Sequence, residues 1–320
     1  MGISASLGSS ALLPAGLGFR NAIINGDFRI NQRAFSSSTT NVYGFDRWFS
    51  VVNDGTVTYS SQTFTLGNPI PGYEPSNFAR MATSGQTVVG AYSILQQKIE
   101  SVRTFAGQLV TISFWAKTTS GTPKVSVELE QVFGTGGSPS SAAFTNFGTV
   151  TLSTSWTRYS VYATVASISG KTLGTNNDNY IGLNLWSSAG STYGSRTNSI
   201  GIQNSTIDFW GVQVEQNYQP TPFEQRPIGV ELDLCQRYYR TFVGGFVGYS
   251  SSGIYEGNCI NFGSPMRASP TVARISDTSI NGFTTPFAQF ISVNGCEVIA
   301  LANNTGNLRF VTNYSAVAEL

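Results

Sequence analysis

The sequence predicts an all-β protein whose main part is an antiparallel β-sandwich. Two observations support this class. Apolar residues alternate with polar ones in many short runs, and loops rich in Gly, Ser, Thr and Asn separate these runs. A period of two is typical of strands that bury one face and leave the other in solvent. No repeat of roughly 20 to 50 residues accompanies the runs, which argues against a β-helix or a propeller.

The alternating runs indicate which side chains face the core of this sandwich, which we expect to span residues 21–226. The predicted inward residues are Ile112, Phe114 and Ala116, then Val125, Val127 and Leu129, then Tyr159, Val161, Ala163 and Val165, and finally Ile181, Leu183 and Leu185. Successive side chains of a strand point to opposite faces, so each set lies on one side of its sheet. We also expect Trp48, Trp156 and Trp210 in the core.

Residues 1–20 precede the first alternating run and form an arm rich in Gly, Ser and Ala, with Arg20 as the only charged residue. Its basic residue follows the apolar patch, which is the reverse of the order in a secretory signal. So short and neutral a segment cannot bury enough surface to fold alone. We expect either a flexible tail or a peptide that becomes ordered when it docks on a larger partner.

One short helix interrupts the β pattern at residues 227–240. Pro227 is typical of a first helical turn. The apolar stripe that follows it consists of Ile228, Leu232, Cys235 and Tyr239. This spacing indicates one face of a helix. The preceding segment, Gln219–Pro227, contains three prolines and predicts an extended linker, so we expect a domain boundary near residue 226.

The chain returns to short β-like runs after the helix, and residues 241–320 predict a smaller C-terminal β domain. A domain of this size has a thin core, because a small chain buries a smaller share of its surface than a large one. We therefore expect contacts between copies of the chain to help stabilise this domain.

The composition excludes several classes of function. The 320 residues include no histidine, so no Ser-His-Asp triad and no imidazole metal site can form. The net charge is +1, with 18 Lys and Arg against 17 Asp and Glu, which argues against nucleic-acid binding. No apolar stretch is long enough to predict insertion in a membrane. Carboxylate catalysis stays open, because Glu128 and Glu130 lie about 7 Å apart on one strand face, although such pairs are ordinarily solvated.

A series of short motifs in a fixed order carries a resemblance to known proteins. The motifs are Asn21–Phe28, Gly44–Trp48, Gln97–Gly107, Thr111–Lys117, Leu152–Tyr159, Ile207–Glu215, Thr221–Pro227, Glu231–Tyr239, Met266–Val272 and Ala316–Leu320. The first resembles the N-x-[IV]-x-N-G-D-F strand that opens jelly-roll carbohydrate-binding modules. The whole series resembles a group of bacteriophage virion proteins, mainly tail-fibre or appendage proteins, including those of cyanobacterial viruses.

The resemblance covers residues 20–320 and implies a jelly-roll sandwich, a short helix and a smaller C-terminal β domain, with an extended N-terminal arm. It implies a structural virion protein that is made in the host cytoplasm and docks on other virion proteins through residues 1–20. We expect recognition of host-surface polysaccharide, a homotrimer and no catalysed reaction. Two alternatives stay open: a capsid decoration or head fibre without a receptor role, and a surface polysaccharide depolymerase.

Side chains that suit a glycan gather between residues 176 and 193. Sugars present C–H faces that stack on aromatic rings and hydroxyls that pair with amides and carboxylates. The candidate glycan-binding residues are Asn176, Asp178, Tyr180, Asn184, Trp186 and Tyr193. In a strand, Tyr180, Asn184 and Trp186 share the face opposite the core. The alternative is that Trp186 packs under a loop or against a neighbouring subunit.

The resemblance also suggests the hypothesis of a structural calcium ion, which carbohydrate-binding jelly rolls often hold between their first and last strands. Asp208 matches the last-strand aspartate of that pattern and is the candidate ligand. The acidic residue expected after the first-strand Phe is replaced by Arg29, which we expect to pair with Asp208 or Asp27 instead. Calcium needs six to eight oxygen ligands. No other cofactor is expected.

Overall fold

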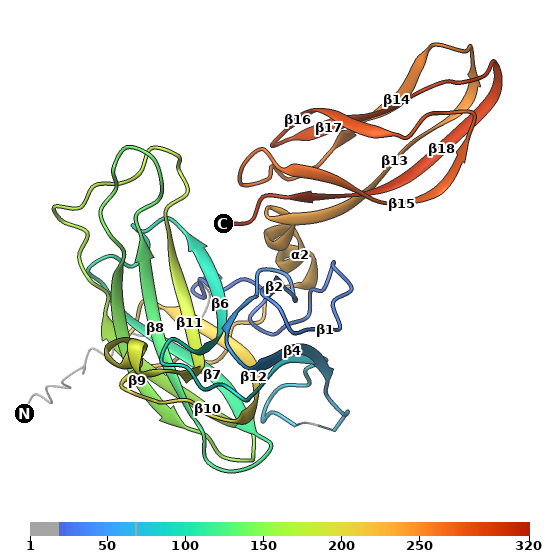
Figure 1. Cartoon of the computed structure of the whole chain (residues 1–320). Helices are drawn as coiled ribbons and strands as arrows, with labels where there is room; N and C mark the ends of the chain where they lie inside the picture. Colours follow the sequence, from blue (N-terminus) through green and yellow to red (C-terminus); the bar gives the residue numbers. More distant parts are fainter. Residues whose placement is uncertain (1–18, 68) are drawn as a thin grey trace, which may run out of the picture.

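The computed structural model describes residues 19–67 and 69–320, and the predicted docking arm at residues 1–20 lies almost wholly outside them. Figure 1 shows a larger β unit, a smaller β unit and helix α2 (Ile228–Gln236) between them. The predicted all-β class is confirmed. No helix within residues 19–67 and 69–320 has the length and apolar character needed to cross a lipid bilayer.

The larger unit consists of two six-stranded antiparallel sheets, which we name after their central strands. The β12 sheet has the order β1 (Ser37–Ser38), β4 (Thr56–Thr63), β5 (Asn77–Ser84), β12 (Ser205–Glu215), β7 (Leu109–Thr118) and β10 (Thr157–Thr164). The β11 sheet has the order β2 (Val42–Tyr43), β3 (Phe49–Asn53), β6 (Tyr92–Glu100), β11 (Tyr180–Ala189), β8 (Lys124–Val132) and β9 (Ala143–Thr151).

The strand order identifies the predicted jelly roll. Eight consecutive strands, β5 to β12, alternate between the two sheets, with the orders β5-β12-β7-β10 and β6-β11-β8-β9. This is the arrangement of two Greek keys wrapped into a double-sheet jelly roll. The strands β1 to β4 extend the two sheets at one edge.

The space between the sheets is filled as the alternation predicts. The inward residues expected on β7, β8 and β11 are all completely buried. Trp48 and Trp210 are also completely buried, and Trp156 packs against the same core while partly exposed. Because each fully buried Val, Leu, Ile or Phe contributes about 1.5–3 kcal/mol, this shared core is what holds the two sheets together.

The opening segment Asn21–Phe28 differs from the expectation, because it forms no regular strand. Asn25 and Phe28 have φ angles of 57° and 56°, in the left-handed region that breaks strand geometry. The completely buried Asn25 side chain stabilises this turn, since its amide donates to the Ile30 carbonyl at 2.8 Å and accepts from the Ile30 N–H at 2.9 Å. The sequence pattern here therefore encodes a turn.

Helix α2 is shorter than predicted, and only part of the predicted stripe is buried. It ends at Gln236, because Tyr239 already pairs with β18 as the first residue of β13. Ile228 of the predicted stripe is 54% exposed, and the buried helical residues are Glu231 and Cys235. Glu231 is buried because its carboxylate accepts hydrogen bonds from the backbone of the opening segment and from Arg226.

The segment before the helix, Gln219–Pro227, is packed rather than free. Phe223 is 6% exposed and belongs to the core of the sandwich. Arg226 is also buried, and its guanidinium donates to the Asn21 carbonyl and pairs with Glu231 at 3.2 Å. These contacts fasten the start of α2 to the opening segment of the sandwich.

The smaller unit contains two three-stranded antiparallel sheets. One has the order β13 (Tyr239–Ser250), β18 (Gly306–Val317) and β15 (Thr271–Asn281), and the other has the order β14 (Tyr255–Asn261), β17 (Gly295–Leu301) and β16 (Phe287–Ser292). Its core is a separate cluster centred on Val298, Phe310 and Tyr314. The smaller unit therefore has its own hydrophobic core.

The two units meet through charged side chains around the end of the chain. Arg47 of the sandwich is 1% exposed, pairs with Glu319, and lies 3.4 Å from the ring centre of Tyr238. Arg33 pairs with the same carboxylate at 3.0 Å. A buried arginine without its carboxylate is strongly destabilising, so Glu319 secures the terminal residues against the sandwich.

Candidate functional site

The outward face of the β11 sheet carries mainly polar side chains, whereas its inward face is mainly apolar. The strand register places Asn184 of β11 between Gln96 of β6 and Glu128 of β8. Lys98 and Glu130 occupy the next outward positions on β6 and β8. Because outward side chains on neighbouring strands stand about 4.5–5.5 Å apart at Cβ, these five groups form one continuous polar row.

Asn184 is the centre of this row and is 1% exposed. Its amide nitrogen lies 3.0 Å from an oxygen of Glu128 and 3.2 Å from an oxygen of Glu130, and it donates to both. Its amide oxygen accepts from Gln96 at 2.7 Å. The orientation of Asn184 is thus fixed from both sides.

Arg196 covers the Glu128 end of the row. It lies on the short helix α1 (Gly194–Thr197), which follows the single turn η1 (Ser191–Tyr193) after β11. Its guanidinium donates to both oxygens of Glu128, at 2.7 and 2.6 Å, and lies 3.7 Å from the ring centre of Phe144. Glu128 is completely buried as a result. The expectation of a solvated carboxylate is therefore wrong for Glu128, because Arg196 supplies the compensating charge.

An aromatic group adjoins this ion pair. The ring centres of Trp186 and Tyr193 are 5.3 Å apart, and those of Tyr193 and Tyr92 are 5.4 Å apart. Trp186 is only 1% exposed, because the η1–α1 loop covers it, and its indole N–H donates to Glu128 at 3.2 Å. Tyr92 and Tyr193 are half-buried, so their rings are the accessible part of the group.

The opposite end of the outward face is more open. Tyr180, Lys98 and Glu130 are all partly exposed there, and the Lys98 ammonium lies 4.6 Å from the ring centre of Tyr180. Burial lowers the pKa of Lys98 and raises that of Tyr180. An aromatic ring next to a cation and a carboxylate offers a stacking surface together with hydrogen-bonding groups.

Two of the predicted glycan residues lie away from this face, in the loop before β11. Asp178 accepts from the Thr135 backbone at 2.8 Å and from its hydroxyl, and Asn176 donates to the same hydroxyl at 2.9 Å. The hydrogen bonds to Thr135 lower the pKa of Asp178. These contacts fasten two loops together. The six predicted residues are therefore divided between this loop and the outward face, along which Tyr180 and Trp186 lie roughly 20 Å apart.

Four residues of the face, Tyr92, Gln96, Lys98 and Arg196, were not predicted from the sequence. The parity of Gln96 and Lys98 on β6 would have been a signal, although a weak one, because Gln97 between them is also polar and is buried. Arg196 had no such signal, because it comes from a loop that folds back over the sheet. Its role follows only from the position of α1.

Asp208 is completely buried on β12, and its carboxylate already has cationic partners. Arg80 lies 2.6 Å from one oxygen and 2.9 Å from the other, and Lys117 lies at 3.8 Å. Arg29 pairs with Asp27 rather than with Asp208. In the described part of the chain, residues 19–67 and 69–320, no three acidic or cysteine side chains are grouped to hold a metal ion. These residues do not fit a calcium site at Asp208.

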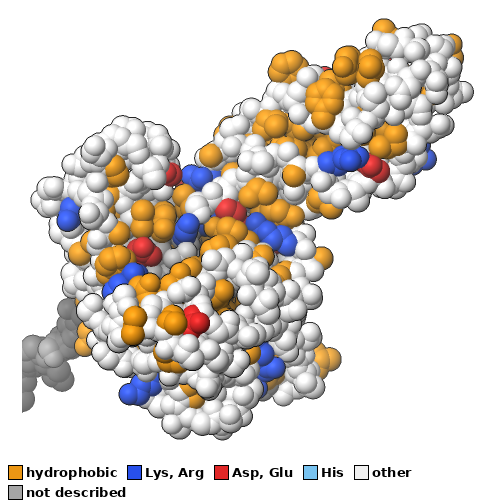
Figure 2. Space-filling model, in the orientation of Figure 1, with side chains coloured by type: hydrophobic (Ala, Val, Ile, Leu, Met, Phe, Trp, Pro, Cys, Tyr) orange, Lys and Arg blue, Asp and Glu red, His pale blue; other side chains and the backbone are white. Residues whose placement is uncertain are grey.

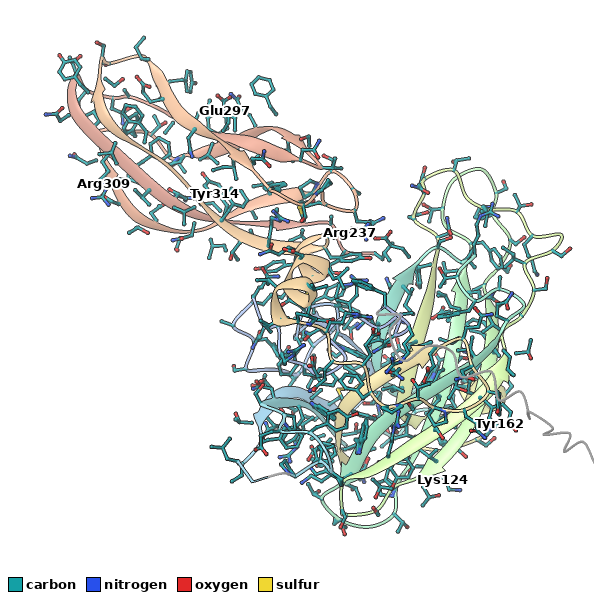
Figure 3. The ribbon with its side chains drawn as sticks, turned by 180° about the vertical axis from the view of Figure 1, so that it is seen from behind. Lys124, Tyr162, Arg237, Glu297, Arg309 and Tyr314 are labelled. Carbon is teal, nitrogen blue, oxygen red and sulfur yellow. The ribbon has the colours of Figure 1, made fainter. Side chains whose placement is uncertain are left out.

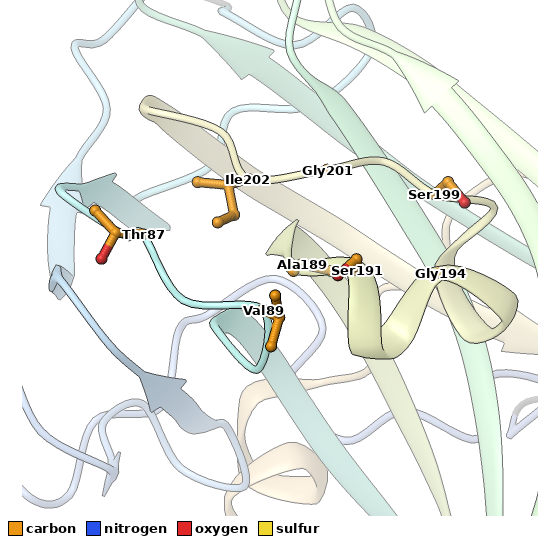
Figure 4. Close-up of a pocket in the computed structure, with 9 residues that line it drawn as sticks. Thr87, Val89, Ala189, Ser191, Gly194, Ser199, Gly201 and Ile202 are labelled. Carbon is orange, nitrogen blue, oxygen red and sulfur yellow. The ribbon is translucent and has the colours of Figure 1, made fainter.

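A hollow of about 390 Å³ opens beside the η1–α1 loop, near the end of β11 (Figure 4). Apolar side chains of Val89 and Ile202 and hydroxyls of Thr87, Ser191 and Ser199 line it. Its lining carries no charged side chain. A hollow with this lining suits a small neutral group rather than an ion.

Comparison with known proteins gives structural likenesses alone. No protein-family model matches the chain, and no curated protein sequence matches it. Tailspike protein 4 of bacteriophage CBA120, in its enzymatically active domain, is 14% identical with a TM-score of 0.36. That match covers 62% of this chain and 22% of the tailspike chain.

Two bacterial proteins have comparable likenesses. A putative sugar binding protein from Bacteroides thetaiotaomicron is 17% identical with a TM-score of 0.37, over 62% of this chain and all of the other. The CBM22-2 xylan-binding domain from Paenibacillus barcinonensis is 16% identical with a TM-score of 0.35, over 57% of this chain and 98% of the other. The jelly-roll assignment itself rests on the strand order described above.

Proposed function

We propose that this chain is a structural protein of a bacteriophage particle that recognises host-surface glycans through the outward face of the β11 sheet. The observation that carries glycan recognition is the set of accessible ammonium, carboxylate and aromatic groups along that face. These groups are Lys98, Glu130, Tyr92, Tyr180 and Tyr193, and they surround the buried amides of Gln96 and Asn184. The phage assignment is supported by the ordered motif series in the sequence.

The two kinds of group suit the two kinds of surface on a sugar. The rings of Tyr180 and Tyr193 supply stacking surface for C–H faces. Glu130 accepts hydrogen bonds from hydroxyls, and Lys98 donates to them. Since Asn184 and Glu128 are already fixed by their partners, the site loses little conformational freedom when a sugar binds. Weak binding at one site suffices when many linked copies engage one surface.

The docking role of residues 1–20 is supported by their composition and by the motif resemblance. At the edge of the described residues, Arg20 donates to the Thr221 hydroxyl at 2.8 Å and to the Pro222 carbonyl at 2.7 Å. These contacts place Arg20 beside the segment that precedes α2.

The homotrimer is expected from the motif resemblance, and association between copies is supported by the surface of the smaller unit. Val243, Val247 and Tyr249 of β13 are 56%, 71% and 68% exposed, and Phe290 is 78% exposed. Figure 2 shows hydrophobic side chains gathered over this unit. Exposed apolar surface of this kind is typical of contacts between proteins. Equilibrium ultracentrifugation of the full chain is expected to give a trimer at micromolar concentration, and a monomer would contradict it.

The proposed function includes no catalysed reaction. Both oxygens of Glu128 are held by Arg196, and the same carboxylate accepts from Asn184 and Trp186. A carboxylate held in this way is poorly suited to exchange a proton with a sugar. A reducing-end assay on host polysaccharide is expected to detect no cleavage.

Binding to a glycan array that includes host lipopolysaccharide tests the proposal. Tyr180→Ala is expected to weaken binding about tenfold, because one stacking contact is lost. Tyr162→Ala is the matched control, since Tyr162 is 66% exposed on β10 of the other sheet (Figure 3). Absence of binding by the unmodified chain, or equal losses in both variants, would contradict glycan recognition at this face.

A further inference from the structure

A polar pocket of about 310 Å³ lies where the sandwich meets the smaller unit. The loop after β6 contributes Arg103, and the loop before β11 contributes Asn177 and Asn179. The smaller unit closes the pocket with Arg267 and Leu320. Its volume falls in the range of pockets that bind small molecules. Neither unit alone forms this pocket.

The charges in the pocket favour an anion. The Arg103 guanidinium is exposed and has no partner within residues 19–67 and 69–320. Among the described residues, Arg267 donates only to backbone carbonyls, those of Ala318 at 3.0 Å and Glu319 at 3.3 Å. In that part of the chain, both guanidinium groups therefore lack a carboxylate partner.

The acidic groups nearby are already compensated. Glu100, which lines the pocket, accepts from Arg237 at 3.0 Å and from the Tyr238 hydroxyl at 2.6 Å. Asp178 in the adjoining loop is held by Thr135. The main-chain oxygen of Leu320, which also lines the pocket, accepts from the Lys98 ammonium at 2.7 Å. Among the side chains that line the pocket, the uncompensated charge is therefore positive.

The remaining lining suits sugar hydroxyls. Asn179 accepts from the Val102 backbone at 2.9 Å through its oxygen, which leaves its NH₂ group to donate. Asn177 is exposed at the rim of the pocket. Amides of this kind both donate to and accept from hydroxyls.

The pocket adjoins the open end of the proposed glycan face. Glu100 at the end of β6 pairs with Tyr180 at the start of β11, so a sugar stacked on Tyr180 lies beside the pocket. One polysaccharide chain can therefore contact the face and the pocket together.

We infer that this pocket binds the carboxylate of an acidic sugar, a uronic acid unit of the host-surface polysaccharide. The inference rests on the proposed glycan recognition and names its substrate class. A guanidinium is planar and pairs with a carboxylate through two parallel hydrogen bonds. Arg103 and Arg267 supply that recognition from two sides, and the asparagines bind the neighbouring hydroxyls.

The test compares two oligosaccharides of matched length on the full chain by isothermal titration calorimetry: trigalacturonate and neutral galactotriose. We expect trigalacturonate to bind at least tenfold more tightly at low salt, with the preference falling at high salt. Arg103→Gln is expected to remove most of that preference. Because Arg103 is exposed, this variant is expected to keep the melting temperature of the unmodified chain.

Arg267→Lys keeps a positive charge but cannot donate two parallel hydrogen bonds to a carboxylate. We expect it to lose part of the preference for trigalacturonate, less than Arg103→Gln loses. Arg309→Gln and Lys124→Gln are the controls, because both residues are exposed and lie outside the pocket (Figure 3). Equal affinity for the two probes, an unchanged preference in Arg103→Gln, or tighter binding of a sulfated galactose trisaccharide would each overturn the inference.

The two failures are distinguishable. Binding of the chain to neutral host glycans without a preference for trigalacturonate would overturn the acidic-sugar pocket and leave the proposed function standing. Absence of binding to either probe and to host lipopolysaccharide would overturn both.

Discussion

The two β units of this chain solve the problem of burial in different ways. The sandwich closes two six-stranded sheets on each other, and three of its five tryptophans, Trp48, Trp186 and Trp210, are at most 1% exposed. The smaller unit has two three-stranded sheets. Nine of the nineteen large hydrophobic side chains that are exposed in the described residues lie between Val243 and Phe290.

The difference follows from sheet width. A wide sheet covers the inner face of its partner completely. Its outward face can then carry polar groups, as the row around Asn184 illustrates. A three-stranded sheet covers less, so part of its apolar surface stays in solvent unless another chain covers it. The sandwich is expected to be stable by itself, and the smaller unit is expected to gain stability from association.

The largest effect is expected from Arg196→Leu in the sandwich. This substitution leaves the completely buried Glu128 without its cation, and we expect it to lower the free energy of unfolding by about 3 kcal/mol. Urea unfolding measures the loss. The double variant with Glu128→Gln is expected to recover part of it, since no uncompensated charge remains. A single variant as stable as the parent would show that the ion pair contributes nothing.

A smaller effect, of opposite sign, is expected from Asp27→Asn. Burial raises the pKa of Asp27 from 3.8 to about 6 despite the nearby Arg29, so the folded state retains a proton that the unfolded chain has lost. Stability therefore falls as the pH rises from about 4 to about 6.

At pH 7 we expect Asp27→Asn to be more stable than the parent by about 2 kcal/mol. Near pH 4 the free energies of unfolding of the variant and the parent are expected to become equal. Urea unfolding at four pH values between these limits measures the difference, and a parent that gains stability with rising pH through this window would contradict the assignment.

Val247→Asn on β13 is expected to change the free energy of unfolding of the chain by less than about 0.5 kcal/mol, since Val247 is 71% exposed. It is expected to weaken association instead. Sedimentation equilibrium measures this as a shift toward monomer, and Tyr162→Asn on the sandwich is the control. If both variants associate like the parent, the exposed apolar strand is not the contact surface.

The smallest effect is expected from calcium. Because Arg80 engages both oxygens of Asp208, added Ca²⁺ is expected to release no heat in titration and to leave the melting temperature unchanged. A rise in melting temperature that chelator reverses would mean that the sandwich depends on a metal after all.

The sequence allowed the strands to be predicted well where their environment is simple. Ile112 and Phe114 on β7, like Leu183 on β11, are buried as their alternation predicts, because one sheet face meets an apolar layer along the whole strand. The prediction of a strand at the opening segment was wrong for a local reason. Asn25 takes a left-handed conformation that its own side chain stabilises, and a pattern of apolar residues contains no sign of that.

The candidate site was predictable only in part, for a related reason. Parity correctly puts Tyr180, Asn184 and Trp186 on one face of β11. Whether a side chain on that face is open depends on which loop folds over it. Arg196 covers Trp186 and Glu128 from a loop, at 5.0 Å from the indole ring, and such a contact is set by the tertiary fold alone.

The contacts of the opening segment with α2 have a mechanical consequence. Arg20 is bonded to Thr221, and the backbone of Asn25 is bonded to Glu231 on the helix that leads into the smaller unit. Tension applied between Arg20 and the smaller unit is therefore carried across these short links. The strands of the sandwich lie outside this path, so such tension loads the links before it loads the β11 sheet.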